Sequence, residues 1–467
     1  MVTGVTHASG SVRPGDLYAA LPGARRHGAE FVAEAAAAGA VAVLTDDAGG
    51  VAADQAGLPA LVVADPRRAL GGVAAEVYGD PTRRLTVLGI TGTAGKTSTA
   101  YLVDSGLRAA GVLPGLIGTV ETRLGDDRVD SERTTPEAPD LQALFAVAAE
   151  RGIDTLTMEV SSHALALGRV EGTRFAVGGF TNLGMDHLDF HADMAEYFSA
   201  KAMLFDGRCA REVVNSDDPA GRKLVTPRTV TVSANGDPAA TWRASEIRDG
   251  GYRQSFQVSG PDGFTELASV AMPGVHNVGN ALLALAMLVS VGVAPRTALD
   301  GIAACRGVPG RMELVDAPGP VRGVVDYAHK PDAVAAVLVA LRAITDGRLV
   351  CVIGAGGDRD RGKRPMMGQA ASNHADLLVV TDDNPRDEDP AAVRAEVLGG
   401  ARGPATVIEV AGRRAGIDEA VRQAAPGDTV AVLGKGHEQG QEVAGEVHPF
   451  DDRIELAASL TERFGAR

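Results

Sequence analysis

The sequence predicts an α/β protein of three domains in which strands alternate with helices. Three observations lead to this class. The chain has 467 residues, about three times the usual domain size of roughly 150 residues. Short apolar runs alternate with helical stretches along most of the chain, which is typical of parallel sheets. A buried strand that begins at Leu85 runs directly into a glycine-rich turn and a helix.

Breaks in this pattern delimit the three domains. The first, residues 1–84, is a small α/β unit that ends near Asp80-Pro81-Thr82. The second, residues 85–309, begins with the strand at Leu85. The third, residues 310–467, follows the linker-like segment Gly307-Val308-Pro309.

Composition and charge exclude several classes of function. The net charge of −15 would repel a phosphate backbone, so we expect no nucleic-acid partner. The longest apolar stretch, Ala281–Val289, is shorter than the ~20 residues of a membrane span, and Met1–Gly10 does not resemble a signal peptide. We expect a cytoplasmic protein. The three cysteines lack the spacing of a disulfide framework or zinc cage and are expected to be buried: Cys209, Cys305 and Cys351.

Lysine is rare in this chain. Of 45 basic residues only six are lysines, so 39 are arginines. Such a chain is expected to keep lysine where a compact or chemically modifiable amine is needed, although codon bias is an alternative explanation. Five of the six lie in the motifs described below: Lys96, Lys201, Lys330, Lys363 and Lys435.

The turn after the strand at Leu85 has the composition of a phosphate-binding loop. It reads Gly92-Thr93-Ala94-Gly95-Lys96-Thr97 and opens a helix, so its amides can hold phosphates, Lys96 can reach the outer phosphates and Thr97 can hold Mg²⁺. The spacing departs from the strict P-loop, and a purely structural glycine turn is the alternative.

Candidate metal ligands follow two later strands. Glu159 ends one strand, at a position from which a carboxylate can hold a phosphate-bound metal; a solvated glutamate is the alternative. His187 and His191 have the i, i+4 spacing of zinc ligands. Because the glutamate of H-E-x-x-H is missing and no cysteine lies near, magnesium is favoured over zinc.

Lys201 lies in the apolar segment Ala200–Phe205, which we expect to start a helix. Burial there would lower the pKa of the amine and leave it neutral and able to take up CO₂ as a metal-binding carbamate. A lysine that extends to solvent is the alternative.

In the third domain, each of four apolar runs is followed directly by an unusual polar sequence. The runs are Val321–Val325, Leu349–Ile353, Leu377–Val380 and Thr429–Leu433. The sequences that follow them are Asp326–His329, Gly354–Asp360, Asp383–Arg386 and Gly434–Glu438. Ligands of open α/β sheets bind outside the carboxyl ends of the strands, so we expect one shared crevice.

Three of these polar sequences contain residues that fit the head group of an amino acid. Arg386 and Arg359 could bind a carboxylate together, while Glu438 could accept an ammonium. A solvated Asp-Asn-Pro-Arg turn with surface salt bridges is the alternative.

The ordered series of motifs resembles the Mur ligase family over nearly the whole chain. The motifs that carry this resemblance are Gly92–Thr97, Glu159–His163, Asn182–His191, Lys201, His276–Asn280, Pro309–Glu313, Asp326–His329 and Gly434–Glu438. Within the family, Gly357–Pro365 and Asp383–Arg386 resemble the enzymes that add diaminopimelate.

This resemblance implies an N-terminal UDP-binding domain, a central P-loop-type ATPase domain with a mainly parallel sheet, and a C-terminal Rossmann-like domain. It also implies a cytoplasmic, monomeric ligase of peptidoglycan precursor synthesis, and thus of cell-wall biogenesis, cell shape and cell division. With ATP and Mg²⁺, it would phosphorylate the D-glutamate carboxylate of UDP-N-acetylmuramoyl-L-alanyl-D-glutamate. The amine of diaminopimelate would then displace the phosphate.

The resemblance also assigns roles to residues at matching positions. Four would be catalytic: Lys96, Glu159, His187 and Lys201. ATP would be bound by Gly92, Thr93, Ala94, Gly95, Lys96, Thr97, Ser98, Asn277, Arg311 and Asp326. The metal would be held by Thr97, Glu159, His187 and carbamylated Lys201. The UDP-peptide would be bound by Ser9, Thr134, Thr135, Ser161 and Arg169. Diaminopimelate would be bound by Arg359, Asp383, Asn384, Pro385, Arg386, Gly434 and Glu438.

The sequence departs from the family pattern at four places: Ala8-Ser9-Gly10, Ala94, Leu167 and Lys330. Two other functions are considered. One is a folylpolyglutamate synthetase of the same superfamily, which the Asp-Asn-Pro-Arg turn and Thr134-Thr135-Pro136 disfavour. The other is a non-catalytic nucleotide-binding protein, suggested by the altered Ala8–Gly10 segment and indicated by ATP binding without turnover.

Overall fold

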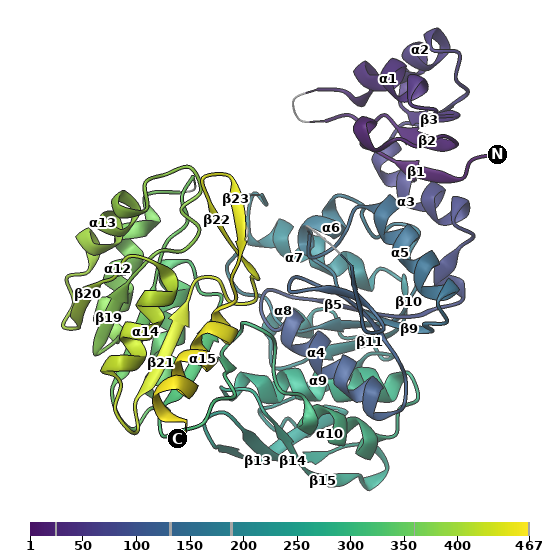
Figure 1. The fold of residues 1–467 in the computed structure, drawn as a ribbon. Coiled ribbons are helices and arrows are strands. Elements are labelled where there is room, and N and C mark those ends of the chain that lie inside the picture. The colour runs from purple at the N-terminus through teal and green to yellow at the C-terminus, as the bar shows by residue number, and fades with distance from the viewer. Residues whose placement is uncertain (24–25, 130–132, 187–189, 359, 466–467) are drawn as a thin grey trace. The chain divides into compact units, whose positions relative to one another are not determined.

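A computed structural model describes residues 1–23, 26–129, 133–186, 190–358 and 360–465 (Figure 1). The chain divides into two compact units, each described here by itself. The larger comprises Met1–Arg248, Ser255–Val270 and Val275–Cys305; the smaller comprises Asp249–Gln254, Ala271–Gly274 and Arg306–Arg467. The predicted α/β class is confirmed. The exact domain boundaries after residues 84 and 309 stay predictions.

The N-terminal part of the larger unit is a four-stranded parallel sheet in the order β1-β2-β3-β4. Its strands are β1 (Gly4–Thr6), β2 (Asp16–Ala19), β3 (Ala42–Thr45) and β4 (Ala60–Val62). Its helices are α1 (Val32–Ala37), α2 (Asp47–Gln55) and α3 (Pro66–Val77). Asp46 and Asp65 start α2 and α3, because each side chain accepts a hydrogen bond from a backbone N–H of the first turn.

The rest of the larger unit surrounds an eleven-stranded sheet in the order β15-β14-β13-β12-β11-β10-β5-β9-β6-β7-β8. The strands are β5 (Thr86–Thr91), β6 (Gly115–Ile117), β7 (Thr122–Leu124), β8 (Asp127–Val129), β9 (Thr155–Glu159), β10 (Phe175–Phe180), β11 (Cys209–Asn215), β12 (Val230–Ser233), β13 (Trp242–Asp249), β14 (Gln254–Ser259) and β15 (Thr265–Val270). The pairs from β13 through β12, β11, β10, β5 and β9 to β6 are parallel, which confirms the predicted mainly parallel sheet.

Helices cover this sheet and place its turns. They are α4 (Lys96–Ala109), α5 (Ala138–Glu150), α6 (Ser162–Ala166), α7 (Met194–Ala202), α8 (Pro219–Arg222), α9 (His276–Ser290) and α10 (Pro295–Ala304). The longest apolar stretch, Ala281–Val289, lies in α9, which is buried along nearly its whole length and packs on β10, β11 and β12. The section Ser233–Gly263 is polar and contains turn residues, yet it includes β13 and β14.

The smaller unit has a six-stranded sheet in the order β16-β17-β21-β18-β19-β20. The strands are β16 (Glu313–Leu314), β17 (Arg322–Asp326), β18 (Leu349–Ile353), β19 (Leu377–Val380), β20 (Thr406–Glu409) and β21 (Thr429–Leu433). A separate hairpin pairs β22 (Gly440–Val443) with β23 (Glu446–Pro449). The helices are α11 (Pro331–Arg342), α12 (Lys363–His374), α13 (Pro390–Gly400), α14 (Arg413–Gln423) and α15 (Asp452–Phe464).

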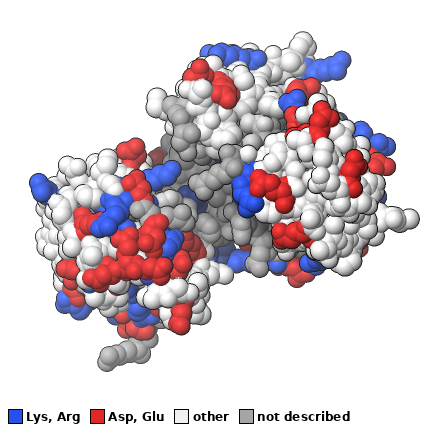
Figure 2. Space-filling model, turned by 90° about the horizontal axis from the view of Figure 1, so that it is seen from above, with Lys and Arg blue, Asp and Glu red and all other residues white. Residues whose placement is uncertain are grey.

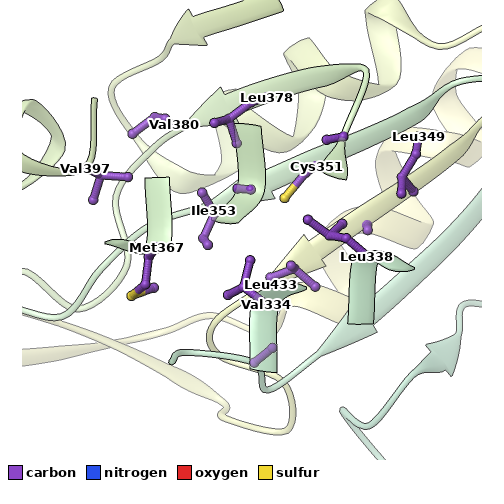
Figure 3. Close-up of a cluster of buried hydrophobic side chains, with 14 of the residues drawn as sticks. Val334, Leu338, Leu349, Cys351, Ile353, Met367, Leu378, Val380, Val397 and Leu433 are labelled. Atoms are coloured by element: carbon purple, nitrogen blue, oxygen red, sulfur yellow. The ribbon is translucent and has the colours of Figure 1, made fainter. Parts of the chain in front are cut away.

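Strand periodicity divides the core of this unit into two layers. Cys351 and Ile353 face the layer that contains side chains of α11, α12 and α13 (Figure 3). Their neighbours Val350 and Val352 face the opposite layer, with side chains of α14 and α15. A sheet covered on both faces explains why its strands are continuous apolar runs in the sequence.

No helix among the described residues is long and apolar enough to cross a membrane. On the face shown in Figure 2, basic side chains are interspersed with acidic ones. All three cysteines are buried, as the sequence predicts.

Candidate functional site

The glycine turn between β5 and α4 has the backbone of a phosphate-binding loop. Gly92 has φ 145° and Gly95 has φ 86°, a conformation that side chains disfavour. A Cβ at Gly92 would lie 1.9 Å from Thr181 Oγ1, and one at Gly95 would lie 2.5 Å from Asn280 Oδ1. The turn is held to β10 because Thr93 N donates to Asn182 O and Ala94 N donates to Asn182 Oδ1. Glycine at both positions is therefore required by the fold as well as suited to phosphates.

Two lysines meet at this turn. Lys96 Nζ donates to Gly92 O at 2.9 Å, and Lys201 Nζ donates to the same oxygen at 2.7 Å. Burial, reinforced by the charge of Lys96, lowers the pKa of Lys201 from 10.5 to about 6. The amine also lies 4.3 Å from the centre of the Tyr197 ring. The structure thus holds a buried amine that is neutral at pH 7, not a lysine extended to solvent.

The position of Lys201 in its helix differs from the prediction. It lies in the last turn of α7 and not at a helix start. The helix begins earlier because the Asp193 side chain accepts a hydrogen bond from Glu196 N.

Glu159, at the end of β9, is fully enclosed beside the glycine turn. Its side chain is 1% exposed. Oε2 accepts from Thr97 Oγ1 at 3.0 Å, and Oε1 accepts from Thr119 N at 2.9 Å. Thr119 Oγ1 adds a third hydrogen bond, at 3.2 Å to Oε2. The strand end therefore places a carboxylate and a hydroxyl side by side, and hard oxygen donors of this kind suit Mg²⁺.

A pocket of about 410 Å³ opens beside the same turn. It is lined by Ala94, Gly95, Thr181, Asn182, Asn215, Asp217, Ala234, Asn235, Val275, His276, Gly279, Asn280 and Leu283. Asn277, a predicted ATP-binding residue, accepts a hydrogen bond from the lining residue Asn280. Ser98 follows Thr97 in the first turn of α4.

Four of the five residues predicted to bind the UDP-peptide lie together. Thr135 Oγ1 donates to Glu159 O and accepts from Ser161 N. Thr134 Oγ1 lies 3.0 Å from Thr119 Oγ1. Arg169 Nε lies 2.9 Å from a carboxylate oxygen of Glu137. The fifth, Ser9, lies in a short 3₁₀ turn after β1.

The smaller unit brings its polar strand ends to one edge. Strands β17, β21, β18 and β19 are adjacent and parallel, so their carboxyl ends lie at one edge of the sheet, where the sequence predicts a shared crevice. Asn384 Nδ2 donates to Glu438 Oε2 at 2.9 Å. A Cβ at Gly434, which has φ 120°, would lie 2.5 Å from Asp383 Oδ2. Asp383, Asn384, Gly434 and Glu438 therefore form one cluster.

Arg386 is fixed beside this cluster. Its backbone has φ 53°, and its N–H donates to Glu442 O in the β22 strand. Arg386 Nη1 donates to the carbonyl of Gly357 at 2.6 Å, and Nε donates to Glu442 Oε2 at 2.9 Å. Pro385 is buried in the rigid turn between Asn384 and Arg386.

The remaining predicted residues fall elsewhere. Arg311 and Asp326 belong to the smaller unit, where the Arg311 guanidinium lies 4.8 Å from the centre of the Tyr327 ring. Asp326 accepts from Met312 N and Ala328 N. Burial raises the pKa of Asp326. His187 and Arg359 lie outside the described residues.

Several functional candidates were missed by the sequence analysis. Thr119 holds Glu159 from a loop 40 residues away, and Arg413 lies 3.6 Å from Asp383 at the start of α14. Glu442 and Tyr197 were likewise not singled out. Only their contacts identify them, because each acts through a partner distant in sequence.

Comparison with known proteins agrees with this arrangement. Residues 90–288 match the family model described as Mur ligase middle domain. Residues 310–436 match the Mur ligase, glutamate ligase domain. Residues 1–78 match the Mur ligase family, catalytic domain.

Two curated relatives are similar over almost their full length. The UDP-N-acetylmuramoyl-L-alanyl-D-glutamate–2,6-diaminopimelate ligase of Streptomyces coelicolor is 55% identical, over 99% of this chain and 93% of the relative. The enzyme of the same name from Corynebacterium glutamicum is 48% identical, over 96% and 89%. A solved structure of a ligase of that name has a TM-score of 0.73 at 30% identity and covers 99% of this chain and 95% of its own. The chain belongs to the Mur ligase family.

Proposed function

We propose that this chain is an ATP-dependent ligase that joins diaminopimelate to the D-glutamate of UDP-N-acetylmuramoyl-L-alanyl-D-glutamate. The observation that carries this proposal is the meeting of Lys96, Lys201 and the Thr97–Glu159 pair at one glycine turn. The 55% identity to a relative with that activity supports the choice of substrates.

The glycine turn would bind the phosphates of ATP. Amides from Gly92 to Ser98 at the start of α4 favour negative charge. Lys96 would move from the carbonyls of Gly92 and Thr93 to the outer phosphates. Asn277 and the pocket beside Asn280 would hold the rest of the nucleotide. We also propose Arg311 and Asp326 as ATP-binding residues.

The residues beside the turn fit magnesium. Thr97 Oγ1 and Glu159 would supply oxygen donors of the kind that Mg²⁺ prefers. Bound Mg²⁺ would neutralise charge on the transferred phosphoryl group. We propose that His187 and the Lys201 carbamate are further ligands.

The neutral amine of Lys201 is suited to carbamylation. Its lone pair would attack CO₂, a new N–C bond would form, and one proton would leave to solvent. With carbon-13 bicarbonate, the wild type is expected to give a carbamate carbon signal that Lys201→Met lacks. An identical signal in that variant would refute the assignment.

The reaction would proceed in two transfers. An oxygen of the D-glutamate carboxylate attacks the terminal phosphorus of ATP, and ADP leaves. The resulting acyl phosphate is a better electrophile than a carboxylate, so the amine of diaminopimelate attacks its carbonyl carbon. Phosphate leaves, the amine loses a proton, and an amide remains. Ser9, Thr134, Thr135, Ser161 and Arg169 would hold the UDP-peptide throughout.

The second unit would select the amino acid. Arg386 and Arg359 would bind the distal carboxylate of diaminopimelate, while Asp383, Asn384 and Glu438 would bind the neighbouring ammonium. L-Lysine lacks that carboxylate, so the two guanidinium groups would not receive their ligand, and sites built around such a polar contact reject the analogue that lacks it strongly.

We further propose domain boundaries at residues 84/85 and 309/310, a cytoplasmic location and a monomer.

The test of the proposed ligase function is phosphate release from ATP and Mg²⁺ with the UDP-dipeptide and, in parallel, meso-diaminopimelate, LL-diaminopimelate, L-lysine or no amino acid. Release that requires both the UDP-dipeptide and one diaminopimelate isomer is expected. ATP binding without acceptor-dependent release would favour a non-catalytic protein.

A further inference from the structure

Lys435 is a lysine without exposed surface. It lies two residues after the end of β21, and its side chain is 0% exposed. Removing an ammonium from water costs several kcal/mol unless charges and hydrogen bonds replace the water. In a chain with six lysines among 45 basic residues, a fully buried lysine requires a specific reason.

The contacts of Lys435 lead directly to the proposed amino-acid subsite. Its Nζ donates to Asn384 Oδ1 at 2.8 Å and lies 3.2 Å from Glu438 Oε2. Glu442 N also donates to Asn384 Oδ1, at 3.0 Å. Two donors thus face the amide oxygen, which turns Asn384 Nδ2 toward Glu438 Oε2 at 2.9 Å. Lys435 and Glu442 N together therefore determine which way the Asn384 amide points.

The same contacts orient the Glu438 carboxylate. Its Oε2 receives both Lys435 Nζ and Asn384 Nδ2, which leaves Oε1 as the oxygen directed away from these donors. The Glu438 side chain is 34% exposed, whereas Lys435 is enclosed. The ammonium is thus enclosed next to a carboxylate that is itself partly open to solvent.

The surrounding charges favour a cationic ligand. Arg413 pairs with Asp452 at 2.6 Å, both fully buried, and lies 3.6 Å from Asp383. Burial raises the pKa of Asp452, while Arg413 and Lys435 oppose that rise. With Glu438, the described groups of this cluster comprise three carboxylates and two cations. An incoming ammonium would balance the remaining negative charge.

We propose that Lys435 is a positioning residue whose buried ammonium fixes the Asn384 amide and the Glu438 carboxylate to receive the ammonium of the diaminopimelate head. This inference rests on the proposed function. Lys435 touches no reacting atom and acts through its two partners.

The first test is Lys435→Met, which keeps the length of the side chain and removes the charge. Charge-assisted hydrogen bonds of this kind correspond to about a tenfold to hundredfold effect, so the KM for diaminopimelate is expected to rise by that factor. The KM values for ATP and the UDP-dipeptide should stay within about twofold of the wild type. The matched control is Lys223→Met, which replaces an exposed lysine. It should leave all three KM values unchanged.

A double-mutant cycle with Glu438→Gln tests the route of the effect. If Lys435 acts through the Glu438 charge, Lys435→Met raises the KM for diaminopimelate much less in the Glu438→Gln background than in the wild type. An equal fold-increase of the KM for diaminopimelate in both backgrounds would overturn the proposal. If circular dichroism shows that Lys435→Met does not fold, Lys435→Gln replaces it. The same rise in the KM for diaminopimelate, with unchanged KM values for ATP and the UDP-dipeptide, is then expected.

The outcomes separate this inference from the proposed function. No release by the wild type with any diaminopimelate isomer overturns both. Normal wild-type activity with an unchanged KM for diaminopimelate in a folded Lys435 variant overturns the role of Lys435 alone. A uniform loss of kcat with all KM values unchanged does the same, because that pattern indicates a general structural role.

Discussion

Replacing Lys201 by methionine should stabilise the protein while removing its activity. The native amine has a pKa of about 6 because it is buried, whereas the ordinary value is 10.5. Between these values the unfolded chain binds a proton at Lys201 that the native chain does not. Unfolding therefore takes up a proton, and native stability is lost as the pH falls from about 10.5 toward 6. Lys201→Met has no such group.

The magnitude follows from the size of the pKa shift. Each unit corresponds to about 1.4 kcal/mol, so at pH 7 the buried amine costs the native state about 5 kcal/mol. The lost hydrogen bond from Nζ to Gly92 O subtracts about 1 kcal/mol. The variant should thus be more stable by about 4 kcal/mol at pH 7, and this advantage should shrink by about 3 kcal/mol at pH 9.

Urea unfolding can measure this difference locally. The chain has a single tryptophan, Trp242, which is 3% exposed and lies in the same compact unit as Lys201. Its fluorescence reports unfolding of that unit, in buffers freed of CO₂ so that the amine stays unmodified. The exposed Lys223→Met is the control and should shift stability by less than about 0.5 kcal/mol at either pH. A Lys201→Met protein that is less stable than the wild type at pH 7, or an advantage equal at both pH values, would refute the reasoning.

Three further predictions concern the other groups of the site. Arg386→Ala should lose the preference for diaminopimelate over L-lysine in phosphate release, and an unchanged preference would count against its assigned role. Glu159→Gln, which keeps the shape and removes the charge beside Thr97, should lower phosphate release at least about 100-fold with an unchanged circular dichroism spectrum; release near the wild-type rate would exclude a metal-binding role. Arg413→Met leaves the buried Asp452 carboxylate unpaired and should destabilise the smaller unit by about 3–5 kcal/mol in urea unfolding. Adding Asp452→Asn should restore much of that loss, and no restoration would show that the pair is not its cause.

The sequence predicts the parallel strands best. Leu349–Ile353 and Thr429–Leu433 are strands with the predicted bounds, because a strand covered on both faces is a continuous apolar run. Chain order alone then requires their polar ends to meet at one edge. The same reasoning places Glu159 at the end of β9 beside the glycine turn.

Elements with mixed polarity were harder to predict. β14 and the start of β13 alternate buried and half-buried side chains, with Trp242, Ala244, Phe256 and Val258 inside. Because the residues between these are polar, the segment has the composition of a polar section with turns. The helix that carries Lys201 starts before the predicted position, because Asp193 caps its N-terminus.

Residues that act through a partner distant in sequence cannot be identified from local sequence patterns. The hydrogen bond from Thr119 to Glu159 spans 40 residues, and that from Lys435 to Asn384 spans 51. Neither distance follows from periodicity or spacing. The sequence marks Lys435 as one of few lysines and as part of the Gly434–Glu438 motif, whereas the reason for its burial is given by the contacts of its ammonium.

The most direct test of carboxylate phosphorylation traces an isotope-labelled oxygen atom of the substrate. The UDP-dipeptide is labelled with oxygen-18 in the reacting D-glutamate carboxylate, and the reaction is run with ATP, Mg²⁺ and diaminopimelate. An acyl phosphate intermediate requires one labelled oxygen to leave with the phosphate, so mass spectrometry should find singly labelled inorganic phosphate in the same amount as the amide product. Unlabelled phosphate formed alongside the amide would contradict carboxylate phosphorylation.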